Sequence, residues 1–106
     1  MTEPDPSNSM AYVKVKIVKL IDDNYPGWVE CELIDVTGQA HVFRDKIPIF
    51  SAEDWGPDVA LPETGGIRCR VVESYHDRVI IDTEKPDGAE SLTGLTCFSV
   101  SPTEVR

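Results

Sequence analysis

Hydrophobic and polar residues alternate along the first ordered-looking part of the chain. Between residues 11 and 18, Val13, Val15 and Ile17 fall on one face, whereas Lys14 and Lys16 fall on the other. Successive side chains of a β-strand point to opposite sides of the sheet, so this pattern predicts a strand with one buried face.

The alternation changes phase within this first strand. After Ile17 the apolar positions move by one residue, to Val18 and Leu20. A β-bulge produces such a slip and bends the strand, as happens at the corners of barrels and sandwiches.

Five further segments show strand patterns, separated by turn sequences. They cover residues 28–35, 39–46, 66–74, 78–84 and 94–101, and the turns include DDNYPG, DVTG, YHD and KPDG. Antiparallel pairing of the first two strands would place Lys14 and Lys16 across from, or diagonal to, Glu30 and Glu32. Opposite charges on one face help to fix the register.

The connection between the third and fourth strands, residues 46–66, lacks this alternation. Pro48 and Pro57 exclude a regular strand or a long helix across it. Ser51 followed by AED is typical of a helix start, so one helical turn over residues 51–54 is expected, with Ser51 as its N-cap. Residues 47–50 include Ile47 and Phe50 and are expected to cap the hydrophobic core.

About six short strands and almost no helix predict an all-β, small single-domain antiparallel barrel. Three meandering strands, a short helical connection and then a hairpin resemble the strand order of the OB-fold. The sixth strand lies outside that pattern, so an SH3-like barrel and a two-sheet sandwich remain alternatives.

The composition is that of a soluble globular protein, with 41% hydrophobic and 27% charged residues. Residues 10–106 are expected to form one domain, and the proline-containing start, residues 1–9, a disordered tail. The first apolar segment contains three lysines, which a secretory signal or membrane span would not tolerate, so a cytoplasmic location is expected. The odd number of cysteines, three, agrees with a reducing compartment.

The residues that could carry chemistry are few and scattered. Cys31, Cys69 and Cys97 lack the short spacing of zinc ligands, and each occupies an apolar-phase strand position, so all three are expected to be reduced and mostly buried. The two histidines, His41 and His76, have no neighbouring nucleophile motif. No metal, no cofactor and no enzymatic activity are therefore expected.

The expected function is binding. A formal net charge of −9 disfavours nucleic acid, although outward Lys14, Lys16, Arg68 and Arg70 would form a basic strip if the first and fourth strands pair. The leading hypothesis is a non-enzymatic protein-interaction module, for instance an inhibitor or immunity-type protein for a basic partner. The alternative is an OB-like domain that binds a small ligand or an oligonucleotide. The candidate binding residues combine aromatic rings with carboxylates: Trp55, Glu53, Asp54, Asp58, Trp28 and Tyr25.

Overall fold

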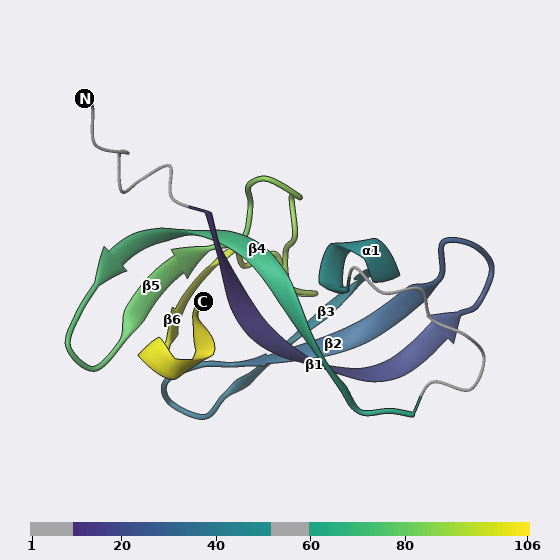
Figure 1. The fold of residues 1–106 in the computed structure, drawn as a ribbon, viewed down its shortest axis with the longest axis horizontal. Coiled ribbons are helices and arrows are strands. Elements are labelled where there is room, and N and C mark those ends of the chain that lie inside the picture. The colour runs from purple at the N-terminus through teal and green to yellow at the C-terminus, as the bar shows by residue number, and fades with distance from the viewer. Residues whose placement is uncertain (1–9, 52–59) are drawn as a thin grey trace.

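The computed structural model describes residues 10–51 and 60–106 (Figure 1). The segment 1–9, predicted to be a disordered tail, lies outside the described residues, as does the segment 52–59. Six antiparallel strands form one sheet in the order β3–β2–β1–β4–β5–β6. The strands are β1 (Met10–Asp22), β2 (Trp28–Ile34), β3 (Ala40–Lys46), β4 (Glu63–Ser74), β5 (Val79–Asp82) and β6 (Cys97–Val100).

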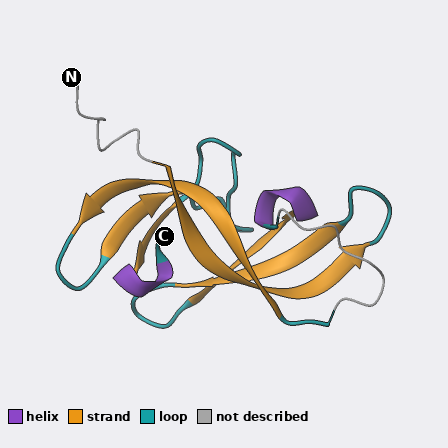
Figure 2. Cartoon of the chain, viewed as in Figure 1, coloured by secondary structure: helices purple, strands orange, loops and turns teal. Residues whose placement is uncertain are grey.

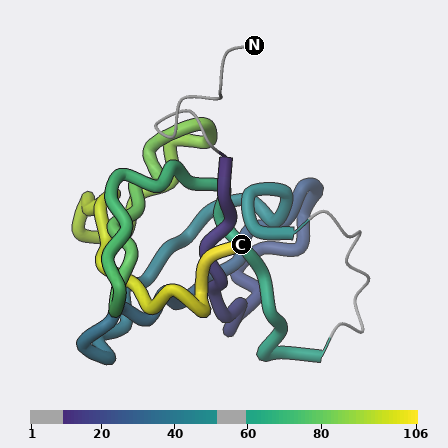
Figure 3. The backbone as a smooth tube through the Cα atoms, turned by 60° about the vertical axis from the view of Figure 1, so that its left-hand side comes forward, coloured from purple at the N-terminus to yellow at the C-terminus, as the bar shows by residue number. Residues whose placement is uncertain are grey.

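The sheet curls into a half-barrel, as the tube in Figure 3 shows. Two single hydrogen bonds join the two edges of the sheet. The Val36 N–H in the β2–β3 turn donates to the Ser99 carbonyl of β6, and the Leu92 N–H between β5 and β6 donates to the Val42 carbonyl of β3, each at 2.8 Å. The all-β antiparallel prediction is confirmed, and so is the pairing of the first and fourth strands that the OB-like order requires. Because all six strands belong to one sheet, the two-sheet sandwich is wrong.

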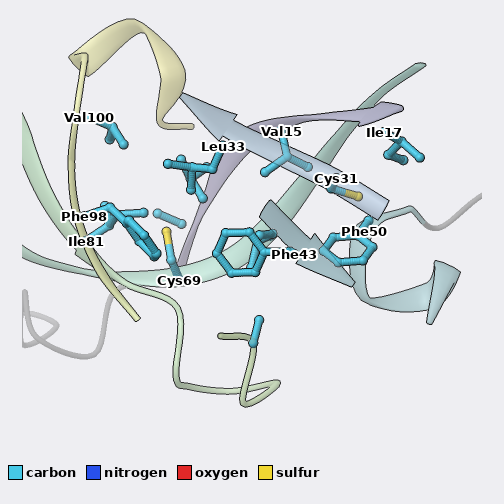
Figure 4. Close-up of a cluster of buried hydrophobic side chains, with 14 of the residues drawn as sticks. Val15, Ile17, Cys31, Leu33, Phe43, Phe50, Cys69, Ile81, Phe98 and Val100 are labelled. Atoms are coloured by element: carbon cyan, nitrogen blue, oxygen red, sulfur yellow. The ribbon is translucent and has the colours of Figure 1, made fainter. Parts of the chain in front are cut away.

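The core lies in the concave side of this curled sheet. Alternate residues of the paired strands point inward, and Val13, Leu33, Phe43 and Ile67 are almost completely inaccessible to solvent. Figure 4 shows Phe43, Leu33 and Phe98 converging from β3, β2 and β6. Burial of each large apolar side chain stabilises the fold by roughly 1.5–3 kcal/mol.

The predicted bulge in β1 is present. Ile17 pairs with Cys31 and Lys19 pairs with Glu30, so Val18 is the extra residue. The bulge also decides which charges meet across the strands. Lys16 lies opposite Glu32, as predicted, and the bulge places Lys19 opposite Glu30.

The short helix α1 (Ile47–Phe50) begins earlier than predicted. Pro48 stands in its first turn, where its fixed φ suits a helix and its missing N–H costs nothing. Ser51 does not start a helix here: it closes α1, with an extended φ of −147° and its N–H donating to the Ile47 carbonyl at 2.9 Å. The remainder of the predicted turn, 52–54, lies outside the described residues. The prediction that Ile47 and Phe50 cap the core is confirmed by their burial.

The end of the chain adds a contact that the sequence pattern did not indicate. After a 3-10 helix at Pro102–Glu104, the Arg106 N–H donates to the Tyr12 carbonyl and the Tyr12 N–H donates to the Arg106 carbonyl, both at 2.8 Å. Val105 forms a bridge with Val13. The C-terminal residues therefore cover the edge of β1 that faces away from β4 (Figure 2).

We predict that Phe50→Ala lowers the free energy of unfolding by about 3–5 kcal/mol, because the ring is buried against the core and its removal leaves a cavity. Urea unfolding followed by far-ultraviolet circular dichroism measures this. Leu92→Ala, at a side chain that is 56% exposed, is the control and should change stability by less than about 0.5 kcal/mol. Equal losses in the two variants would contradict the capping role of α1.

Candidate functional site

Of the six candidate binding residues, the structure describes two. Tyr25 and Trp28 both lie at the β1–β2 hairpin, in the turn and at the start of β2. Four lie outside the described residues: Glu53, Asp54, Trp55 and Asp58.

The hairpin exposes more apolar surface than the aromatic pair alone. Tyr25 is 99% exposed and Trp28 39%, and next to them in sequence Leu20 is 37% and Ile21 44% exposed. They share the end of the hairpin but not one face, because Leu20 pairs with inward Val29 whereas Trp28 points the other way. We call these four residues the hairpin patch. Sequence reasoning missed Leu20 and Ile21 because it assigned Leu20 to the buried phase of the strand. The shift of the apolar positions after Ile17 could have indicated their exposure. It marks the bulge, and β1 continues past the bulge and beyond the core.

The turn that carries the patch is held against α1. The Ile47 N–H donates to the Gly27 carbonyl at 2.9 Å, and a Cβ on Gly27 would lie 2.7 Å from Ile47 Cδ1. Gly27 also has a φ of +85°, which favours glycine. Trp28 pairs with Asp22 on one side and with Lys46 on the other. The aromatic side chains therefore project from a fixed turn.

The charge at the hairpin tip is negative. Asp22 Oδ1 accepts a hydrogen bond from the Asn24 N–H at 2.9 Å. Within the described residues, no lysine or arginine nitrogen lies within 4.0 Å of the carboxylates of Asp22 or Asp23. The tip thus combines exposed apolar side chains with carboxylates that have no cationic partner in that part of the chain.

The basic strip expected on β1 and β4 is formed but partly neutralised. Arg68 donates to Asp87 through Nε at 3.0 Å and Nη2 at 2.6 Å, and this pair raises the pKa of Arg68. Arg70 lies 3.7 Å from Asp82. Lys14 and Lys16 have no described carboxylate within 4.0 Å. Of the four residues of the strip, only the two lysines therefore form no ion pair within 4.0 Å in the described part of the chain, and Lys16 lies opposite Glu32.

Hollows follow these lysines on the outer face of the sheet. One, of about 320 Å³, is lined by residues that include Tyr12, Lys14, Gly66 and Arg106. A second, of about 240 Å³, contains Lys16 and shares Lys14 with the first. We call the two together the β1–β4 groove.

A histidine–aspartate pair lies where the β2–β3 turn meets β6. His41 Nε2 is 2.8 Å from Asp35 Oδ2, and the His41 ring packs on Phe98 with centroids 4.9 Å apart. Hydrogen bonds from the Thr37 hydroxyl first, and then from His41, lower the pKa of Asp35 below its ordinary value, with further contributions from the Gln39 and Thr37 N–H groups. The pair therefore holds the β2–β3 turn against β6.

The cysteines divide into two classes. Cys31 and Cys69 are buried, and burial first, with nearby carboxylates second, raises the pKa of Cys31 to about 12 and that of Cys69 to about 11. The prediction that all three are mostly buried is wrong for Cys97, which is exposed because Phe98 and Val100 occupy the inward positions of β6. Within the described ranges, no three His, Cys, Asp or Glu side chains lie together as metal ligands would.

Comparisons with protein-family models, curated proteins and solved structures give no significant match for this chain. None of the helices in residues 10–51 and 60–106 is long and apolar enough to cross a membrane.

We expect one thiol per chain to react rapidly with Ellman's reagent in the native state at neutral pH, and three in denaturant. Cys97 is accessible, whereas the raised pKa values of Cys31 and Cys69 keep those thiols protonated and the fold shields them. Cys97→Ser is the control and should abolish the rapid phase alone. Two or more rapidly reacting thiols in the native protein would contradict the buried positions.

We also expect Asp35→Asn to lower the melting temperature in a pH-dependent way. Because the pKa of Asp35 in the folded protein lies below its ordinary value of 3.8, the ionised group stabilises the fold above about pH 3.8, and this contribution is lost as the pH falls further. The gap in melting temperature between wild type and variant should therefore be constant above about pH 5 and shrink below about pH 3.8. Asp77→Asn, at a side chain that is 70% exposed, is the control. A gap that widens on acidification would overturn the assignment.

Proposed function

We propose that this protein is a non-enzymatic interaction module that binds a basic protein partner through the hairpin patch. The observation that carries the proposal is the concentration of four exposed apolar side chains, Leu20, Ile21, Tyr25 and Trp28, at one end of the sheet. Tyrosine and tryptophan supply much of the binding energy at protein interfaces, because their large rings become desolvated while their polar atoms keep hydrogen bonds.

The rigidity of the turn supports the same function. Gly27 is hydrogen-bonded to Ile47 of α1, and α1 is anchored in the core through Phe50. A patch on a fixed turn loses less conformational entropy on binding than one on a free loop.

Charge complementarity indicates the chemistry of the partner. Asp22 and Asp23 lie within the hairpin, and the whole chain carries a net charge of −9. A partner with lysines or arginines around an apolar contact would be attracted over distances of about 10 Å at ordinary salt and would associate rapidly. An inhibitor or immunity-type protein that neutralises a basic partner is one form of this function.

The chemistry of the described residues favours binding over catalysis. The groups whose pKa values shift most are Asp35, which is hydrogen-bonded within the turn, and Cys31 and Cys69, whose raised pKa values disfavour the reactive thiolate. The free thiols also suit a reducing compartment, so we propose that the protein acts in the cytoplasm.

The test is site-specific photocrosslinking in lysate of the organism that encodes the protein. p-Benzoylphenylalanine replaces Tyr25 in one variant and Val72 in a control variant, because Val72 is 57% exposed on β4 and away from the hairpin. We expect position 25 to capture a specific protein of high isoelectric point that position 72 does not capture.

Purified partner then allows a quantitative measurement. Tyr25→Ser and Trp28→Ser should each weaken binding by about tenfold or more, while the melting temperature stays close to that of the wild type. Raising sodium chloride from about 50 to about 300 mM should slow association. Capture at both positions alike, a partner that is not basic, or hairpin variants that bind as tightly as wild type would contradict the proposal.

A further inference from the structure

The β1–β4 groove is built by three parts of the chain that are distant in sequence. Its floor is the outward face of β1, with Tyr12 and Lys14, and one wall is Thr64 and Gly66 of β4. The other wall comes from the C-terminal residues, through Glu104 and Arg106. The paired hydrogen bonds between Tyr12 and Arg106 fix that wall in place, so the groove is part of the fold.

Gly66 is a glycine that the fold itself does not require. Neighbouring Gly65 cannot carry a Cβ, because the atom would lie 2.8 Å from Ile17 Cδ1 and from the Phe50 carbonyl. A Cβ on Gly66 would make only ordinary contacts, the nearest being Tyr12 Cδ1 at 3.6 Å, and the φ of Gly66 is not positive. Glycine inside a strand costs stability, and where packing does not explain it a close approach by a ligand is a common reason.

The cations of the groove form no close ion pair within the described residues, although Glu32 lies opposite Lys16 and Glu104 stands in the wall. The side chains of Lys14, Lys16 and Arg106 have no carboxylate within 4.0 Å there, whereas Arg68 beside them is paired with Asp87. Lys14 lines both hollows, so its ammonium group can reach a ligand in either. A phosphate or carboxylate is the group that such a lysine binds.

An aromatic surface lies beside these cations. Tyr12 is 52% exposed and stands between the larger hollow and a third, of about 260 Å³, that Arg68 and Pro48 help to line. Gly66 borders both of these hollows and has no side chain to cover the Tyr12 ring. A planar ring can therefore stack on Tyr12 while its acidic group reaches Lys14.

The surrounding charge limits the size of the ligand. Glu32 and Glu104 lie in the walls, and the chain as a whole is strongly acidic, so a long polyanion would be repelled beyond the groove. The larger hollow, at about 320 Å³, is at the lower end of the range of roughly 300–1,000 Å³ found for small-molecule sites.

We propose that the β1–β4 groove binds a small organic anion in which a planar ring carries a phosphate or carboxylate group. The ring stacks on Tyr12 above Gly66, and Lys14, with Lys16 and Arg106 beside it, binds the acidic group. This site is separate from the hairpin patch and does not depend on the proposed partner.

The test is a nuclear magnetic resonance titration of the isotope-labelled full chain with four probes: adenosine monophosphate, benzoate, adenosine and inorganic phosphate. We expect adenosine monophosphate or benzoate to bind in a saturable manner, with the largest amide shifts at Tyr12, Lys14 and Gly66. Adenosine and inorganic phosphate should each bind more weakly, because each offers only half of the contacts. Comparison of the affinities for adenosine monophosphate and benzoate decides whether phosphate or carboxylate is preferred.

Matched variants separate the site from general charge effects. Lys14→Gln and Gly66→Val should each weaken binding of the preferred probe by about tenfold or more, through loss of the cation and filling of the groove. Lys85→Gln removes an equal charge outside the groove and should leave binding unchanged. Gly66→Ala should retain or raise the melting temperature, since its Cβ has room. A retained melting temperature shows that a side chain at position 66 does not unfold the protein, so weaker binding then comes from a blocked groove.

Three results would overturn the proposal. The first is the absence of saturable binding by both ring-bearing anions at millimolar concentration. The second is equal binding by the Lys14→Gln, Lys85→Gln and Gly66→Val variants. The third is binding of a thymidine decanucleotide in this groove without binding of the mononucleotide, which would assign the groove to single-stranded nucleic acid.

Discussion

The strand β1 pairs with β4 along its first half and with β2 along its second, and only Lys16 and Ile17 pair with both neighbours. This offset makes the sheet curl, because the two neighbours diverge from the middle of β1. The bulge at Val18 occurs where β1 leaves β4 and continues with β2 alone. Extra twist at a bulge is what a strand needs in order to turn a corner.

The same offset leaves one edge of the first half of β1 without a strand neighbour. Buried or half-buried peptide groups must find hydrogen-bond partners, and the C-terminal residues provide them through Arg106 and Val105. One wall of the β1–β4 groove therefore exists because of the offset pairing. At the other end of β1, the strand extends past the core with β2, and the hairpin patch results. Both proposed binding surfaces follow from where β1 changes its neighbours.

Period-two patterns were sufficient for the strands, because burial on one side of a sheet leaves a direct trace in the sequence. The phase slip after Ile17 likewise revealed the bulge. The pattern did not predict the structure at the ends of strands, neither the direction of a side chain nor the start of a helical turn. Cys97 follows the apolar character of its segment yet points outward, because Phe98 sets the phase of a strand only four residues long. Ser51 has the composition of a helix start, but Pro48 and the burial of Ile47 and Phe50 place the helical turn before it.

The sequence could predict a residue of the candidate site only where the type of amino acid itself indicates an exposed position. Tyr25 and Trp28 were identified because aromatic residues beside a turn are candidates for recognition, whereas Leu20 and the β1–β4 groove depend on contacts between distant segments. The net charge likewise does not reveal how the charged residues are distributed over the surface. The chain is acidic, yet seven of its ten Lys and Arg residues occupy outward positions of β1, β3 and β4: Lys14, Lys16, Lys19, Arg44, Lys46, Arg68 and Arg70.

This distribution changes what the charge of −9 means for binding. The total governs long-range attraction, whereas contact chemistry depends on which cations remain unmatched after the sheet forms. Cross-strand pairing places Glu30 between Lys19 and Arg44, so these charges neutralise one another along the face. Lys14 instead lies opposite Gly66, which can offer it no carboxylate. The register that β1 and β4 adopt thus leaves a lysine beside an open space, and an acidic protein can in this way retain a local site for an anion.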